Sequence, residues 1–301
     1  DLDRALSLAD NAWASLYRGL IRYQHGDLKR AVEDLGRAIQ LKPGFAEAYY
    51  RRGLLYAELG EYDRAFEDQD RALELEPEHA AALTARGVAR AARGEAEQAL
   101  DDLNQGCRLD PESHQAHFRR GLVRQWLGMH NEALIDFGHV IDLGLVSGPV
   151  YLARGNAYAE VGKHWQAISD YSRAIELQPK NAAAYQARAM ARSEMHDYQQ
   201  AIEDFGRALE LDPALAAAFA SRGAAYEKLG EHERAIKDLD RALELAPDLA
   251  IAHYDRGLAY GSLGDYDKAS RDLNRAGELD PSLQPDNGAA HNHQKLEGGA
   301  A

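Results

Sequence analysis

The feature that most constrains this chain is a block of 34 residues that recurs in register from Ala12 to Leu283. Residues 46–79 align with residues 80–113 along their whole length, and the alignment continues without insertion or deletion. A fixed period of this length indicates a linear stack of similar units, because one unit alone cannot bury its apolar face. The 301 residues are therefore expected to form a repeat array and not one compact core.

Each repeat contains two apolar stripes with the spacing of amphipathic helices. In residues 46–79, Leu55 and Leu59 belong to the first stripe, Phe66 and Leu73 belong to the second, and a glycine-containing turn separates them. Small residues recur at the eighth, twentieth and twenty-seventh positions, where they let two helices approach closely. Proline at the thirty-second position of most repeats cannot continue the second helix. The pattern predicts one antiparallel helix pair in each repeat.

These recurring positions resemble those of the tetratricopeptide repeat (TPR) family. The resemblance implies an all-α fold, a right-handed superhelical solenoid of antiparallel helix pairs. The eight predicted repeats span residues 12–45, 46–79, 80–113, 114–147, 148–181, 182–215, 216–249 and 250–283. The related pentatricopeptide class, which binds RNA, has a longer period and would fall out of register over this distance.

The ends of the chain and the fourth repeat depart from the pattern. Residues 1–11 match the end of a second helix and are predicted to be the truncated helix of a preceding repeat. Residues 284–301 lack apolar periodicity and are predicted to form a flexible C-terminal tail. In the fourth repeat, Leu145 stands where proline is expected. The sequence leaves open whether this is drift, or a bend or contact point at which Leu145 and Val146 are exposed.

Two charged positions are invariant across the repeats. Arginine fills the seventh position and aspartate fills the twenty-third position of all eight repeats. The residues are Arg18, Arg52, Arg86, Arg120, Arg154, Arg188, Arg222 and Arg256, with Asp34, Asp68, Asp102, Asp136, Asp170, Asp204, Asp238 and Asp272. Antiparallel helices place the two positions roughly level, so we interpret them as a structural ladder of bidentate pairs. The alternative is that both sets of side chains lie on solvated outer faces.

Composition excludes several classes of partner. The formal net charge of −14 disfavours nucleic acid, because an acidic chain repels phosphate groups. The apolar runs are too short to predict a membrane span. Cys107 is the only cysteine, so no intrachain disulfide is expected, which fits a reducing compartment such as the cytoplasm. The chain begins at Asp1 without a methionine, so the sequence leaves open whether a targeting signal or a catalytic domain precedes it.

The sequence contains no recognisable catalytic or cofactor motif. We find no phosphate-binding loop, nucleophile elbow or zinc-type cysteine pairing, and no cofactor is predicted. Cys107 occupies a core position of a predicted second helix. His114 and His117 lie three residues apart on one predicted helix, but no third ligand accompanies them, so no metal site is predicted. We therefore expect a protein that is not an enzyme.

The family resemblance implies that the first helices line a concave groove that holds partner segments. The first, second and fourth repeats carry large side chains at the implied groove positions. The predicted partner-binding residues are Trp13, Tyr17, Tyr50, Arg51, Leu54, Phe118, Arg119, Leu122 and Trp126. Aromatic residues and arginine are the usual anchors of binding surfaces, although the alternative is that some of these side chains fill the core between repeats. The C-terminal half carries mostly small and acidic residues there, which predicts a shallow, acidic surface.

We therefore predict a non-catalytic scaffold or adaptor that binds a peptide or helix of a partner protein in the groove. One alternative is a regulatory or substrate-docking arm of a larger enzyme. Another is a self-assembling scaffold, in which the exposed N-terminal half-repeat joins copies into a homo-oligomer. The lysine and asparagine pattern of family members that grip chaperone carboxyl termini is missing, since Asn156 is the only asparagine at a ninth position.

Overall fold

The computed structural model describes residues 11–283, and these residues are helical throughout, without a strand. They form two compact units that divide between Val146 and Ser147. The first unit contains α2 (Ala12–Gln24), α3 (Leu28–Leu41), α4 (Ala46–Glu58), α5 (Tyr62–Leu75), α6 (Ala80–Ala92), α7 (Ala96–Leu109), α8 (His114–Trp126) and α9 (His130–Asp142). The second unit contains α10 (Gly148–Glu160), α11 (His164–Leu177), α12 (Ala182–Glu194), α13 (Tyr198–Leu211), α14 (Ala216–Lys228), α15 (His232–Leu245), α16 (Ala250–Ser262), α17 (Tyr266–Leu279) and a final 3₁₀ turn, η1 (Pro281–Leu283).

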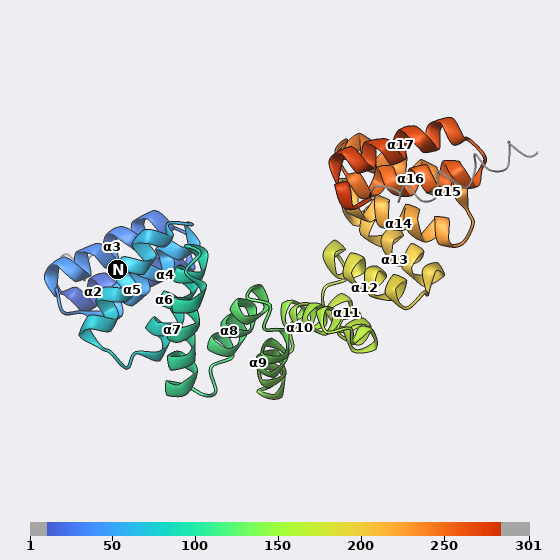
Figure 1. Ribbon diagram of the computed structural model, residues 1–301. Helices are drawn as coiled ribbons and strands as arrows, with labels where there is room; N and C mark the ends of the chain where they lie inside the picture. Colours follow the sequence, from blue (N-terminus) through green and yellow to red (C-terminus); the bar gives the residue numbers. More distant parts are fainter. Residues whose placement is uncertain (1–10, 284–301) are drawn as a thin grey trace, which may run out of the picture. The chain divides into compact units, whose positions relative to one another are not determined.

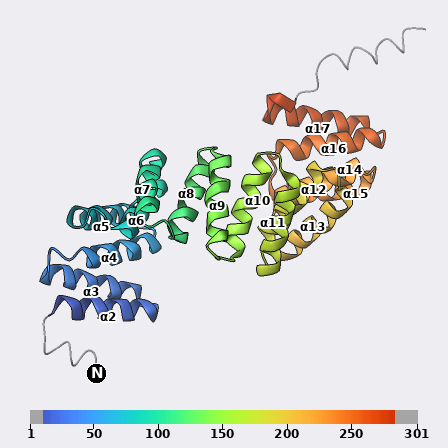
Figure 2. The same cartoon turned by 90° about the horizontal axis from the view of Figure 1, so that it is seen from below.

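Within each unit the helices pack as consecutive antiparallel pairs, which confirms the predicted fold class. Each first helix packs most extensively against the helix that follows it, as in α2 with α3 and α16 with α17. The second helix of a pair then packs against the first helix of the next, so the hairpins stack in chain order (Figures 1 and 2). The predictions for residues 1–11 and 284–301 lie outside the described residues, apart from Asn11, whose side chain caps α2 through the Trp13 amide at 3.0 Å.

Small residues at the eighth position allow the two helices of a pair to meet. A Cβ atom built on Gly121 would lie 2.6 Å from Cε1 of Phe137, and one built on Gly155 would lie 2.6 Å from Cε1 of Tyr171. Both rings are buried, so they fill the space that a larger side chain at the glycine would need. The recurring glycine is therefore a packing requirement of the helix pair.

The turn inside each pair requires a left-handed residue. Glycine provides it in seven repeats, with φ between 73° and 83° at Gly26, Gly60, Gly94, Gly128, Gly162, Gly230 and Gly264. In the sixth repeat the same place is taken by His196, with φ of 61°. A side chain in this region of backbone space is uncommon, because Cβ crowds the following carbonyl group.

The fourth repeat ends in a different turn from the others. Gly144 adopts φ of 91° after α9, and the amide of Leu145 donates to the carbonyl oxygen of Val140 at 3.2 Å. This left-handed glycine ends the helix without the usual proline. Leu145 and Val146 are exposed, and the boundary between the two units follows directly.

Candidate functional site

The first helices form the inner face of each unit. In the first unit α4 packs against α6 and α6 against α8, while in the second unit α10, α12, α14 and α16 pack in succession. No comparable packing joins the second helices of neighbouring repeats within residues 11–283. The first helices therefore lie on the side where the stack is more closely packed, and all nine predicted partner-binding residues belong to the first helices of the first unit.

Helix α2 presents two exposed aromatic rings. Trp13 and Tyr17 are 46% and 55% exposed, and their ring centroids are stacked 6.0 Å apart. The ring centroids of Trp13 and buried Phe45 lie 4.5 Å apart in a T-shaped arrangement, and Lys42 Nζ lies 4.7 Å from the Phe45 ring centroid. Trp13 is therefore held in place on one side while its other side faces solvent.

The predicted binding residues Tyr50 and Arg51 of helix α4 already have partners within the first unit. Arg51 Nε donates to Glu47 Oε1 at 2.6 Å, and its guanidinium carbon lies 5.2 Å from the ring centroid of Tyr50. Tyr50 is half-buried and packs on His79 with centroids 4.8 Å apart. A hydrogen bond from His79 is the main reason that the pKa of Glu47 is lowered, with Arg51 contributing. Arg51 therefore already has an acidic partner within its own helix.

Of the two arginines among the predicted binding residues, the one on helix α8 has no partner among the described residues. Phe118 is half-buried against Phe137 at 5.9 Å, and Leu122 is also half-buried. Arg119 is exposed, with no hydrogen bond or ion pair to any described residue. Trp126, two turns further along the helix, is 60% exposed. Between α4 and α8, helix α6 presents mainly small side chains to the same face.

The invariant arginines and aspartates meet in every repeat. Nε and Nη2 of each arginine donate to the carboxylate of the aspartate 16 residues later, at distances from 2.5 to 3.1 Å. The eight aspartates are only 1–7% exposed, whereas the arginines are half-buried. Two donors aimed at one carboxylate is the geometry that suits a guanidinium group. The paired side chains join the two helices of each repeat.

The arginines also link neighbouring repeats, which the sequence analysis missed. The Nη1 atom of the ladder arginine donates a hydrogen bond to the residue at the twenty-fifth position of the preceding repeat wherever that residue has a side-chain oxygen. Arg86 donates to Asp70 at 2.6 Å, Arg120 to Asn104 at 3.1 Å, Arg188 to Ser172 at 2.9 Å and Arg256 to Asp240 at 2.7 Å. Variation between aspartate, asparagine, serine and glycine at this position hid the shared role.

Four repeats add a second arginine, at the eleventh position, to the same aspartate. Its Nη1 atom lies 2.5 to 2.8 Å from the carboxylate, in the pairs Arg22–Asp34, Arg90–Asp102, Arg124–Asp136 and Arg192–Asp204. The other four repeats carry tyrosine there instead, as at Tyr56 and Tyr158, whose ring centroids lie 5.7 Å from the guanidinium carbon of the ladder arginine. The repeats therefore differ in how many cations surround the buried aspartate.

The fourth repeat adds two histidines to this cluster. The rings of His117 and His139 lie 4.2 Å apart, and the Nε2 atoms of both lie 3.1 Å from the carbonyl oxygen of Pro111. Burial, followed by the charges of His139 and Arg120, lowers the pKa of His117. His114 lies apart, with Nε2 3.2 Å from the Leu143 carbonyl oxygen.

Residues 11–283 contain no group of three or more histidine, cysteine or carboxylate side chains that could hold a metal ion. Cys107 is buried in the core, as predicted, and burial raises the pKa of its thiol. None of the described helices combines the length and hydropathy needed to cross a membrane.

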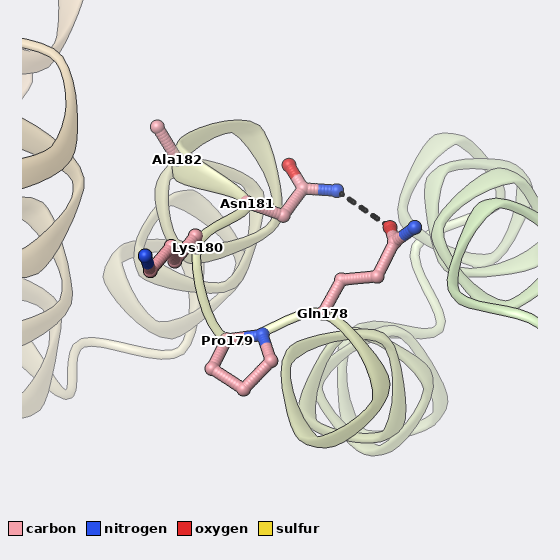
Figure 3. A pocket seen from close by; sticks show the side chains of 5 residues that line it. All are labelled: Gln178, Pro179, Lys180, Asn181 and Ala182. Atoms are coloured by element: carbon pink, nitrogen blue, oxygen red, sulfur yellow. Dashed lines mark hydrogen bonds between the residues drawn. The ribbon is translucent and has the colours of Figure 1, made fainter.

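A surface hollow lies at the turn after α11 and has a volume of about 690 Å³. It is lined by five consecutive residues, Gln178 to Ala182 (Figure 3). Asn181 Nδ2 donates to Gln178 Oε1 at 3.4 Å across this turn. One short segment supplies the whole lining, so the hollow has no opposing wall that could enclose a ligand.

The inner face of the second unit is not uniformly shallow, contrary to the sequence-based expectation. A cavity of about 330 Å³ opens between α12 and α14, beside Met190 and Ala224. The small residues at these positions leave space that larger side chains occupy elsewhere.

These features define a protein built of stacked helical repeats. Family models described as tetratricopeptide repeat match residues 46–79, 69–114, 149–181, 171–203, 216–249 and 250–283, and a model described as TPR repeat matches residues 19–60 and 191–230. The chain belongs to the tetratricopeptide repeat family. None of the curated proteins matches it.

Solved structures with similar folds include TPR proteins. The TPR protein YrrB, described as having an unusual peptide-binding site, is 24% identical over 61% of this chain and 95% of its own, with a TM-score of 0.55. A chain of the APC/C hetero-tetramer Cut9–Hcn1 is 20% identical over 84% of this chain and 50% of its own, with a TM-score of 0.61. A TPR protein from Parabacteroides merdae is 21% identical over 82% of this chain and 98% of its own, with a TM-score of 0.58.

These similarities establish the fold, and the repeats place the chain among protein-interaction scaffolds. Proteins of this family are typically non-catalytic and bind other proteins.

Proposed function

We propose that the inner face of the first unit binds a segment of a partner polypeptide. The observation that carries this proposal is the set of large side chains exposed on α2 and α8. Trp13, Tyr17 and Trp126 are each between 46% and 60% exposed, and Arg119, on the same helix as Trp126, has no partner among the described residues. Exposed aromatic residues gathered on one face are characteristic of interaction surfaces.

The contacts separate five of the nine predicted residues into two groups. Tyr50, Arg51 and Phe118 already pack or pair within the unit, so they support the shape of the face. Arg119 and Trp126 are free to contact a partner, and an unpaired guanidinium group can bind a carboxylate or stack on an aromatic ring. YrrB, which shares this fold, has a peptide-binding site, and the same use of the fold is consistent with these residues.

The double variant Arg119→Ala/Trp126→Ala tests this proposal. Loss of true anchors typically costs at least ~2 kcal/mol of binding free energy, which corresponds to roughly thirtyfold in affinity. We expect a loss of that order when partner capture from the source cells is quantified by mass spectrometry.

The matched control is Trp165→Ala, which removes a tryptophan that is 73% exposed on the second helix α11. Capture should be unchanged in this variant. Equal losses in both variants would mean that the partner does not recognise the inner face of the first unit. Unchanged capture in the double variant would exclude Arg119 and Trp126 as anchors.

A further inference from the structure

Two cavities lie between the first helices of adjacent repeats but differ in size. One lies between α2 and α4 and has a volume of about 60 Å³, and the other lies between α12 and α14 and has a volume of about 330 Å³. Both are lined by residues at the sixth, ninth, tenth, twelfth, thirteenth and twenty-fourth positions of their repeats. We call the larger one the α12–α14 socket.

Three substitutions account for the difference in volume. In the first unit the cavity is lined by Tyr23, Arg51 and Leu54. At the equivalent positions, the socket is lined by Ser193, Ser221 and Ala224. The volume that the large side chains fill in the first unit is therefore open in the second unit.

The socket has an apolar floor and a polar rim. Phe205 and Ala225 are buried at its base, while Met190, at its side, is 51% exposed. An apolar cavity of ~150 Å³ can hold benzene, so the socket has room for a larger aromatic ring. The thioether of methionine makes favourable contacts with such rings. The Ser193 side chain also lines the socket, and its Oγ atom is buried without a hydrogen-bond partner.

One wall of the socket is held in an uncommon backbone conformation. His196 replaces the turn glycine of the other repeats, with φ of 61°, and lines the socket. Its Nδ1 atom lies 2.8 Å from the hydroxyl oxygen of Tyr198, another lining residue. Strained side-chain positions of this kind persist at ligand sites more often than elsewhere.

The next position along the same face is acidic. Asp255 on α16 is half-buried and has no hydrogen bond or ion pair to any described residue. Burial raises its pKa to about 6, Lys228 on the socket rim acts in the opposite direction, and Glu227 adds to the increase. Glu227 is already engaged, with Oε2 2.6 Å from His232 Nδ1 and Oε1 3.1 Å from Ser262 Oγ. Asp255 therefore differs from Glu227 in having no hydrogen bond or ion pair to a described residue.

We propose that the second unit binds an extended segment of another polypeptide, with an aromatic side chain in the α12–α14 socket and a lysine or arginine on Asp255. Neighbouring helices pack about 8–10 Å apart, and an extended chain advances about 3.3 Å per residue. The aromatic and basic residues of the segment are therefore about three positions apart. This second site lies outside the face proposed above for the first unit and does not depend on it.

Fluorescence polarisation with labelled synthetic peptides tests this inference on the full chain. The probes are Gly-Ser-Trp-Ala-Ala-Lys-Gly-Ser and the peptide with tryptophan and lysine exchanged, because the chain direction is open. We expect one of them to bind saturably, and replacement of its tryptophan by alanine or of its lysine by glutamate to weaken binding at least tenfold. Equal binding of all the peptides, or of none, would overturn the proposal.

Protein variants show where the peptide binds. Ala224→Leu and Ser221→Arg each restore a side chain that fills the equivalent cavity of the first unit, so each should reduce affinity at least tenfold. Asp255→Asn should weaken the lysine peptide but not its lysine-to-alanine derivative. Lys237→Leu, which adds an apolar side chain at an exposed position of the outer helix α15, is the matched control and should leave affinity unchanged. Full affinity in both filled-socket variants would refute the site, whereas Arg119→Ala/Trp126→Ala should not alter peptide binding.

Discussion

Removing one ladder arginine should destabilise the protein most where its aspartate has no second arginine. In the fifth repeat, Asp170 accepts hydrogen bonds from Arg154 alone among the described residues, with both distances 2.7 Å. In the sixth repeat, Asp204 accepts from Arg188 and also from Arg192, whose Nη1 atom lies 2.5 Å away. Both aspartates are buried. Arg154→Ala therefore leaves a buried carboxylate without a cation, whereas Arg188→Ala leaves Asp204 with one.

The expected costs follow from what each carboxylate retains. Loss of one partner from a buried ion pair costs ~3–5 kcal/mol of unfolding free energy, mainly because the other charge is left uncompensated. Loss of hydrogen bonds to a charged group that keeps another partner costs ~1.5–3 kcal/mol. The guanidinium groups are partly exposed, which favours the lower end of both ranges. Arg154→Ala should therefore be the more destabilising change, and Arg188→Ala/Arg192→Ala should approach its cost.

Denaturant unfolding of the full chain, followed by circular dichroism, measures these differences within one unit. Arg173→Ala is the matched control, because Arg173 forms an exposed pair with Glu176 at 2.6 Å in the same helix as Asp170. No measurable change is expected there. The reasoning is refuted if Arg154→Ala and Arg188→Ala lower stability equally, because the second arginine would then have no effect on the buried charge.

Two further predictions concern the fourth repeat. The lowered pKa of His117 means that this side chain binds a proton less readily in the folded state than in the unfolded state, so stability should fall as pH drops below about 6.5. His117→Gln should reduce this loss of stability when unfolding is compared at pH 7.5 and 5.5. Gly121→Ala should lower the free energy of unfolding by ~1–3 kcal/mol, because the new Cβ atom would meet Phe137. Gly138→Ala places its Cβ atom in open space and should be neutral or stabilising. A calorimetric melt that ranks the two variants the other way would contradict the packing argument.

Periodicity predicted the parts of this protein that every repeat shares. The helix pairs, and the pairing of Arg154 with Asp170, follow from residues that recur at constant spacing. Side chains that vary could not be placed in this way. The bond from Arg51 to Glu47 joins neighbouring turns of one helix, and nothing in the repeat pattern distinguishes it from an arginine that faces a partner. Arg119, at the same position two repeats later, has no such partner.

The socket was missed for a related reason. Alanine and serine at the inner positions of the second unit predicted a flat surface, since a sequence shows which side chain is small but not what surrounds it. The structure places Ala224 and Ser193 between helices whose spacing is set by other residues, so a small side chain leaves a cavity. Cavity volume is a property of the neighbours as much as of the residue itself.

The invariant ladder positions and the variable positions of the inner face have different consequences for binding. The ladder arginines and aspartates hold the helices of each repeat, and their identity is the same in all eight repeats. The sixth, ninth and twelfth positions vary between repeats, as the contrast between Leu54 and Ala224 shows, and the volume between the helices varies with them. The side chains at these three positions therefore decide whether the space between two adjacent repeats is filled or forms a socket. A partner segment that crosses several repeats would place successive side chains against successive pairs of repeats. We therefore expect Ala224→Leu to remove binding of the aromatic residue while Asp255 continues to attract the basic one.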